Sequence, residues 1–158
     1  MNIWRLVTHH TDPDAMLSWI RQNQRIAIGW GSIGDIEANA YHSAGAIGAA
    51  IRQHYPSSRN SGLGGPSLWN LYDELKNDDF VILSTIKRRV LVVEIKRDYE
   101  YVAQKPPFRG EYQHQRRIKI TQIDPEKLWQ AAGAAPAAGQ NIRYTLMKCA
   151  DSVSEDSL

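Results

Sequence analysis

Three consecutive β-branched segments in the second half of the chain restrict what this sequence can fold into. Residues 79–85, 89–95 and 115–123 are rich in Val, Ile and Leu, and no helical pattern separates the first two. Strands that follow one another without a helical crossover pair antiparallel. The polar stretch TIKRR at residues 85–89 predicts a hairpin between the first two segments. We therefore predict a mainly antiparallel sheet.

The rest of the chain carries helical patterns and shorter strand patterns. Apolar spacing predicts helices over residues 12–23, 36–55, 67–77 (with Ser67 as its N-cap) and, more briefly, 124–132. Gly, Pro and Ser predict a loop over residues 56–67 and a flexible connection over residues 133–140, and further strands are predicted at 2–8, 25–30 and 142–147. The fold class expected is α+β, a curled, mainly antiparallel β-barrel flanked by two or three helices.

Length and composition predict one domain and exclude several classes of protein. The chain has 158 residues, which we divide into a domain over residues 1–148 and an acidic tail over residues 149–158 that we expect to be disordered. Apolar runs are too short to span a bilayer, and the N-terminus lacks a signal-peptide pattern. The single cysteine excludes an internal disulfide framework and a cysteine-rich zinc site. We expect a cytoplasmic protein without membrane association, cofactor or metal.

Positive charge is concentrated in the predicted sheet. Residues 86–120 hold ten Lys or Arg against four Asp or Glu, a net charge of +6 in a chain whose total is +2. A basic surface with interleaved aromatic residues is typical of nucleic-acid binding. We expect Arg88, Arg89 and Arg117 to contact the phosphate backbone.

Trp30 lies in a glycine-rich stretch that matches the spacing of a dinucleotide-binding loop. Gly29, Gly31 and Gly34 give G-x-G-x-x-G, but no Asp or Glu occurs between Glu37 and Asp73 to bind a ribose, and no βαβ pattern follows. Glycines on both sides leave room for a partner to lie against the indole. A nucleobase stacked on such a ring gains about 1–3 kcal/mol. The alternative is a tryptophan that closes the core.

Asp79, Glu94 and Lys96 give a competing hypothesis. Many Mg²⁺-dependent nucleases combine one Asp with Glu-x-Lys on a neighbouring strand, where the carboxylates hold the metal. In those enzymes a helix packs back after the Glu-x-Lys strand, whereas residues 97–115 contain two prolines and show no helical period. A nuclease is therefore the alternative function, and a small-molecule-binding domain is a third.

The order of the motifs resembles one family. The stretches IWRLVTHH, RIAIGWGSIGDI, SLWNLYDEL, DDFVILS, RVLVVEIKRDYEY and EYQHQRRIKI, which span residues 2–146, are similar to PUA-like modules of the EVE and YTH type. The resemblance is strongest to modules fused to modification-dependent restriction endonucleases. This chain departs from the pattern where KNDDF replaces a Gly-Asp turn and where Arg97 replaces a glycine.

The resemblance implies a barrel with an aromatic pocket for a modified base. The ligand-binding residues that it implies are Trp30, Gly31, Ser32, Tyr99, Tyr101, His114 and Arg116. Trp69 is expected in the core, beside Tyr72. Because no nuclease domain follows before residue 158, we expect a non-enzymatic, restriction-associated module that binds DNA or RNA carrying a modified base, alone or with a separate effector protein.

Overall fold

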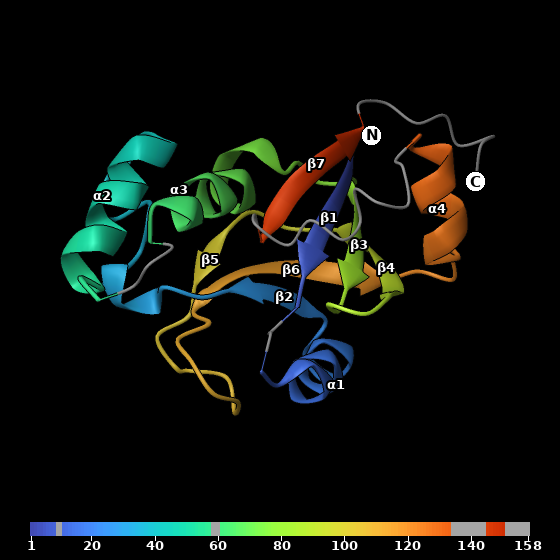
Figure 1. Ribbon diagram of the computed structural model, residues 1–158, viewed down its shortest axis with the longest axis horizontal. Coiled ribbons are helices and arrows are strands. Elements are labelled where there is room, and N and C mark those ends of the chain that lie inside the picture. Colours follow the sequence, from blue (N-terminus) through green and yellow to red (C-terminus); the bar gives the residue numbers. More distant parts are fainter. Residues whose placement is uncertain (9–10, 58–60, 134–144, 151–158) are drawn as a thin grey trace.

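The β-branched segments form one curled, open sheet in a computed structural model that describes residues 1–8, 11–57, 61–133 and 145–150. The strand order is β2-β6-β4-β3-β1-β7, and β5 also pairs with β6 (Figure 1). The strands are β1 (Ile3–Val7), β2 (Arg25–Ile28), β3 (Phe80–Ser84), β4 (Arg89–Ile95), β5 (Glu100–Tyr101), β6 (His114–Ile120) and β7 (Leu146–Ala150).

The sheet is mainly antiparallel, as the sequence predicts. Among the described residues only β1 and β3 pair in parallel, with Ile3 opposite Phe80 and Val7 opposite Ser84. The predicted hairpin joins β3 to β4. The expected barrel is corrected to a half-barrel, because β2 and β7 are the two ends of the strand order and do not pair with each other within the described part of the chain.

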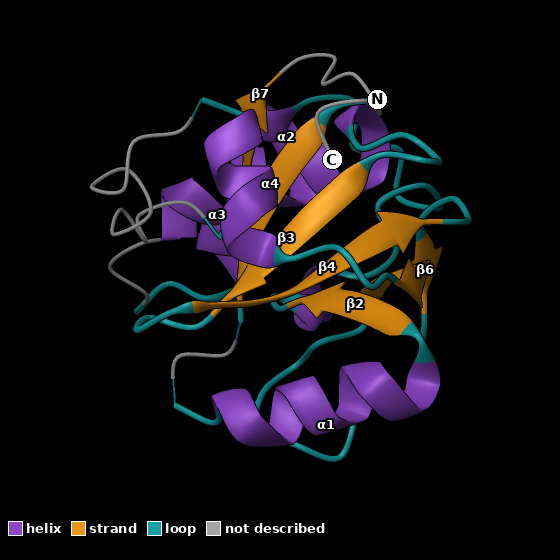
Figure 2. Ribbon diagram, turned by 90° about the vertical axis from the view of Figure 1, so that its right-hand side faces the viewer, coloured by secondary structure: helices purple, strands orange, loops and turns teal. Residues whose placement is uncertain are grey.

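Within the described residues four helices pack on the sheet, more than the two or three expected. They are α1 (Pro13–Asn23), α2 (Ala44–His54), α3 (Ser61–Trp69), which continues into a π-helical segment at Asn70–Glu74, and α4 (Pro125–Ala131). The first three bury side chains in one core with the inner face of the sheet, whereas α4 places Leu128 and Trp129 in a smaller core on the opposite face. Figure 2 shows α1 separated from the other helices by the sheet strands.

The expected loop at 56–67 is wrong from residue 61 onward, and the expected cap at Ser67 is wrong. Residues 61–69 are helical despite Pro66, and Ser67 is buried inside α3, where its Oγ accepts a hydrogen bond from the Leu146 amide at 3.3 Å. A Cβ at Gly65 would lie only 2.4 Å from the Ala44 carbonyl oxygen of α2. Gly65 therefore permits close packing of α3 against α2. Glycine is also typical of turns, so the composition of this stretch led to the prediction of a loop.

Helix α2 is also shorter than predicted, because Ser43 caps it and residues 36–40 form turns. At the C-terminal end, Cys149 and Ala150 belong to β7, so the boundary expected at 149 is corrected by two residues. The connection expected at 133–140 lies, after Gly133, outside the described residues, as do residues 151–158. Within the described ranges no helix is both long and apolar enough to cross a bilayer.

Candidate functional site

Trp30 has a strained backbone at the end of β2. Its φ of 63° and ψ of 37° place it in the left-handed region, which a bulky residue adopts at a cost of about 1–3 kcal/mol. Flanking glycines alone do not explain this conformation, because the residue that adopts it is the tryptophan itself. Such a conformation persists only where the surrounding structure holds it.

Four hydrogen bonds from distant segments hold the Trp30–Ser32 loop. The Trp30 carbonyl accepts from His114 Nε2 at 3.0 Å, and the Gly31 carbonyl accepts from the Tyr101 hydroxyl at 2.8 Å. The Gly31 amide donates to the Glu111 carbonyl at 2.9 Å, and the Ser32 amide donates to the Tyr55 hydroxyl at 3.0 Å. The loop is therefore held by the residue that ends α2, by β5, by β6 and by the segment that precedes β6.

The Trp30 indole is half-buried and lies against α3. A Cβ at Gly64 would lie 3.0 Å from two atoms of the ring, so Gly64 gives the indole the space it occupies. The ring packs on the edge of the main core but is not part of its fully buried interior. The Trp30 ring is therefore neither fully accessible to a partner nor fully buried as a tryptophan that closes the core, the two alternatives that the sequence left open.

A row of aromatic side chains continues from the loop into the core. Tyr99 is buried and stacks on the His114 imidazole with ring centroids 5.8 Å apart, while Tyr72 meets Tyr99 edge-on at 5.2 Å. Trp69 contacts Tyr72 at 5.8 Å, and both of these rings are half-buried and pack against the main core. Tyr101, also half-buried, lies 5.5 Å from His114.

Asp35 is a site residue that the sequence reasoning missed. Burial is the main cause that raises the pKa values of Tyr72, Tyr99 and Tyr101, and the Asp35 carboxylate adds to each of these shifts. One carboxylate therefore lies within electrostatic reach of three tyrosines of the row. The signal available in the sequence was its position, five residues after Trp30 in the same glycine-rich stretch.

His114 is buried and its imidazole is fully used within the protein. Because Nε2 bonds to the Trp30 carbonyl, that nitrogen carries the proton, and Nδ1 accepts from the Tyr99 hydroxyl at 2.7 Å. The same hydroxyl accepts from the Ile36 amide at 3.1 Å. The direct ligand contact expected for His114 is therefore corrected to a positioning role beneath Trp30.

Arg116 is likewise buried and engaged inside the protein. Its Nη1 donates to the carbonyls of Leu71 and Leu75 at 2.8 and 2.7 Å, and its Nε donates to the Arg97 carbonyl at 2.6 Å. These contacts cap the end of the π-helical segment that carries Tyr72. The ligand contact expected for Arg116 is corrected to this structural role.

Glu111 joins the Trp30 loop to α2. Its carboxylate accepts hydrogen bonds from the Ser32 hydroxyl and, at 2.5 Å, from the Tyr55 hydroxyl. The bond from Ser32, followed by the bond from Tyr55, lowers the pKa of Glu111. Lys105 lies 3.9 Å from the same carboxylate. Ser32, an expected ligand residue, is exposed, but its hydroxyl and amide both serve this anchor.

The three arginines expected to bind phosphate differ in their ion pairing and in their exposure to solvent. Arg89 forms a two-bonded ion pair with Glu126 and lies over the Trp129 ring at 4.6 Å. Arg117 pairs with Glu100 at 3.1 Å, and Arg88 is exposed on the β3–β4 hairpin. That hairpin lies at the right of Figure 1, whereas the segment between β2 and α2 that holds Trp30 lies at the left. The two regions therefore lie well apart in this view.

The residues of the nuclease alternative do not converge on a metal site. The Asp79 carboxylate is buried and accepts from the Asn2 amide, the Trp4 indole and the Lys76 amide at 2.9–3.0 Å. Lys96 pairs with Glu94 and with Asp78. Within the described ranges no group of three or more His, Cys, Asp or Glu could hold a metal ion. Asp79 instead fastens the N-terminus to the start of β3.

We expect Asp79→Asn to destabilise the protein by about 2–3 kcal/mol, because three N–H donors, one of them the buried Trp4 indole, then share one neutral acceptor. Urea denaturation measures the change. Glu94→Gln is the control, since its half-buried ion pair contributes about 1 kcal/mol or less. Equal stability of the two variants would contradict the role assigned to Asp79.

Fold and site together define an α+β protein in which a half-barrel sheet positions a strained tryptophan beside a row of aromatic rings. Residues 4–131 match the family model described as a domain of unknown function (DUF8426). This match covers most of the chain, and the protein belongs to that family. No curated protein matches the sequence.

Proposed function

We propose that this protein is a non-enzymatic module that captures a modified base of DNA or RNA in an aromatic pocket built around Trp30. The observation that carries the proposal is the strained Trp30 backbone, held by four hydrogen bonds while the indole stays half-buried. A tryptophan needed only for packing could occupy an unstrained position. The strain is accounted for by a ring that must be presented to a flat ligand.

The surroundings of Trp30 suit a nucleobase. Trp69, Tyr72 and Tyr101 are half-buried, so each ring has both a packed and an accessible part. The Asp35 carboxylate near these tyrosines is an acceptor for the amino or imino N–H on the edge of a base. A methyl group on the base adds apolar contact with the rings, which discriminates by about 1–3 kcal/mol.

We further propose that the half-barrel is PUA-like, of the EVE or YTH type. Support comes from the mainly antiparallel curled sheet and from Trp30, Tyr99 and Tyr101 lying near one another, as the resemblance implies. The proposal assigns no catalytic residue and no cofactor to this chain. Any cleavage of the bound nucleic acid would require a separate effector protein.

The test is binding to DNA and RNA oligonucleotides of one sequence, unmodified or carrying a single 5-methylcytosine, 5-hydroxymethylcytosine or N6-methyladenine. We expect one modified oligonucleotide to bind at least about 10-fold more tightly than its unmodified counterpart. Equal affinity for all of them would overturn the proposed reading of a modification.

We expect Trp30→Ala to abolish that preference, because stacking on the indole contributes about 1–3 kcal/mol per base. Its stability should fall by no more than about 1–2 kcal/mol, since the ring is half-buried. Fluorescence anisotropy measures the affinities and thermal unfolding measures the stability. Ile86→Ala is the matched control, because Ile86 is an exposed apolar residue on the distant β3–β4 hairpin. A preference that survives in Trp30→Ala would contradict the proposal.

A further inference from the structure

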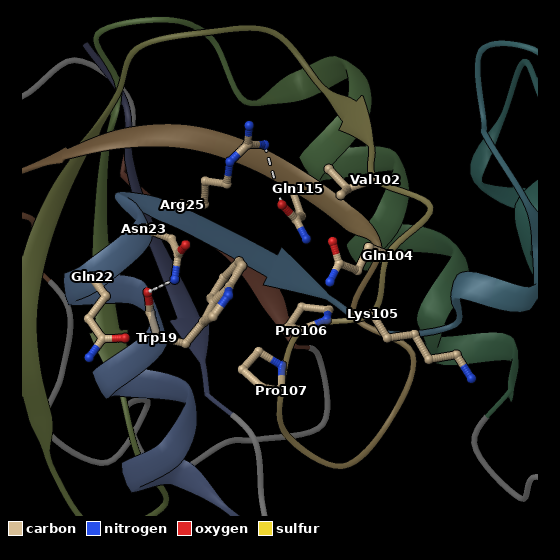
Figure 3. Close-up of a pocket in the computed structure, with 10 residues that line it drawn as sticks. All are labelled: Trp19, Gln22, Asn23, Arg25, Val102, Gln104, Lys105, Pro106, Pro107 and Gln115. Carbon is tan, nitrogen blue, oxygen red and sulfur yellow. Dashed lines mark hydrogen bonds between the residues drawn. The ribbon is translucent and has the colours of Figure 1, made fainter.

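A pocket lies between α1 and the segment that follows β5. Its volume is about 430 Å³, within the range of roughly 300–1,000 Å³ that small-ligand pockets occupy. Side chains from α1, from residues 102–107 and from β6 face one another around the start of β2 (Figure 3). We call this site the amide pocket. Neither the sequence motifs nor the proposed aromatic site accounts for it.

The lining of the amide pocket has an unusual composition. None of its ten residues is acidic, two are cationic, and four are primary amides: Gln22, Asn23, Gln104 and Gln115. Primary amides both donate and accept hydrogen bonds, as the edges of nucleobases do. Buried Pro106 and the largely buried Trp19 supply apolar surface. Such a lining matches a ligand that has a polar planar group and a negative charge.

The polar groups of the amide pocket are partly fixed and partly available. Gln115 is buried, and its side chain donates to the Tyr112 carbonyl and accepts from Arg25 at 3.3 Å. Arg25 is also 3.5 Å from Glu100, so its charge is shared. By contrast, the Gln22 and Gln104 side chains are exposed and make no hydrogen bond with the described residues. They form a pair of free amides, one on each side of the pocket (Figure 3).

The amide pocket and the Trp30 loop are structurally connected. Lys105, whose side chain is 60% exposed, lies 3.9 Å from Glu111, and Glu111 in turn holds Ser32 next to Trp30. Arg25 opens the same strand that ends just before Trp30. Trp30 is the fifth residue after Arg25, so the Cα atoms of the two residues are at most about 18 Å apart. One strand of nucleic acid can therefore reach both places.

We propose that the amide pocket binds a nucleotide that flanks the captured base in the same strand, an inference that rests on the proposed function. Lys105 and Arg25 contact its phosphate, which competes for the two cations with Glu111 at 3.9 Å and Glu100 at 3.5 Å, carboxylates that lie outside the pocket lining. Gln22 and Gln104 bond to the edge of its base or to its sugar. The pocket adds affinity for the strand and takes no part in recognising the modification.

The first arm of the test does not depend on the aromatic site. The side-chain NH₂ signals of Gln22 and Gln104 are followed by ¹⁵N NMR while the 5′-monophosphates AMP, CMP, GMP and UMP are added to the full chain. We expect saturable shifts of both signals with at least one of them, and inorganic phosphate alone to give weaker shifts. Absence of shifts with all four would overturn the proposal.

The second arm uses 12-nucleotide strands, with and without the modified base, and the variants Gln104→Ala and Lys105→Ala. We expect each variant to bind both strands about 5- to 10-fold more weakly while the ratio of the two affinities stays unchanged. Lys105→Ala should also reduce the slope of log K against log salt by about 0.7–0.9, the value for one phosphate contact. Lys127→Ala on α4 is the control, because it removes one exposed charge on the opposite face of the sheet.

The two arms separate failure of the pocket from failure of the proposed function. If Gln104→Ala and Lys105→Ala bind strands as Lys127→Ala does, the amide pocket is overturned, whatever preference Trp30 confers. The proposal is overturned in that case even if the pocket binds nucleoside monophosphates, because the pocket would then bind a free nucleotide and not a nucleotide within a strand. If the variants weaken strand binding and no modification is preferred, the pocket stands and the reading of a modified base fails.

Discussion

Acidification from pH 7 to pH 5 is expected to lower the free energy of unfolding by about 2 kcal/mol, and by about 3 kcal/mol at pH 4, through His114 alone. Burial lowers the pKa of His114 to about 4, against the opposing effects of its bond to Trp30 and of Asp35. The ordinary value in the unfolded chain is about 6.5. As the pH falls below 6.5, the unfolded chain binds a proton at His114 that the folded protein does not bind until the pH approaches 4. The contribution of His114 to stability is therefore fully present above pH 6.5 and is lost as the pH falls towards 4.

The physical reason lies in the two bonds of the imidazole. Nδ1 accepts from Tyr99 and Nε2 donates to Trp30, so a second ring proton would meet the Tyr99 hydroxyl in a buried site. Tyr99 would then have to give up donating to the ring and reorient its hydroxyl. The same protonation would disturb the carbonyl that fixes the Trp30 loop. Acid should therefore weaken ligand binding at Trp30 before the protein unfolds.

Urea denaturation at pH 7, 6, 5 and 4.5 measures this dependence, and His114→Gln is the control, because glutamine also donates and accepts but does not titrate in this range. We expect a flatter profile for His114→Gln between pH 6.5 and 4.5. Below that range Glu111, whose pKa is lowered, adds its own loss of stability. Parallel profiles for the wild type and His114→Gln would show that His114 is not the source.

The strands were predictable from the sequence, whereas the open edge of the sheet was not. The segments at Phe80–Ser84, Arg89–Ile95 and His114–Ile120 are strands whose apolar side chains fill the two cores. Each of these segments is continuous in the sequence, so a short stretch of sequence is enough to predict each strand. Whether the sheet closes depends on β2 and β7, which are distant in sequence. Glycines in α3 misled the prediction, since close packing on α2 and a turn favour the same residue.

The candidate site was predicted in part. Trp30, Tyr99 and Tyr101 do lie together, linked through His114 and Gly31. The sequence could not show that the Trp30 backbone is left-handed or that Asp35 lies within electrostatic reach of Tyr99, because both depend on contacts between distant segments. It also could not separate buried from exposed positions on β6. His114 and Arg116 belong to a stretch that reads as a basic surface, yet both are buried.

Arg116→Met is expected to destabilise the protein by about 4 kcal/mol, the largest effect of any substitution considered. Methionine fills most of the same volume but donates no hydrogen bond. The carbonyls of Leu71, Leu75 and Arg97 would each lose their bond to the guanidinium, and an unsatisfied buried polar group costs about 1–3 kcal/mol. Thermal and urea unfolding measure the change.

Arg117→Met is the matched control, because Arg117 is the next residue on β6 and its exposed ion pair with Glu100 contributes about 0–1 kcal/mol. Arg116→Lys should rescue little, since one ammonium group cannot reach the three carbonyls that Nε and Nη1 serve together. If Arg116→Met is as stable as Arg117→Met, the assigned role is wrong.

The consequence of Arg116→Met for binding follows from the segment that Arg116 caps. Tyr72 lies within the π-helical segment Asn70–Glu74. Arg116 Nη1 donates to the carbonyl of Leu71, which precedes Tyr72, and to the carbonyl of Leu75, which follows it. Release of this segment should loosen the Tyr72–Tyr99 contact, and with it the wall of the aromatic row. At a temperature where the variant is still folded, its preference for a modified base should therefore fall while its affinity for the unmodified strand changes little. A direct phosphate contact by Arg116 would instead weaken binding to both strands equally, so the ratio of the two affinities decides between the two roles.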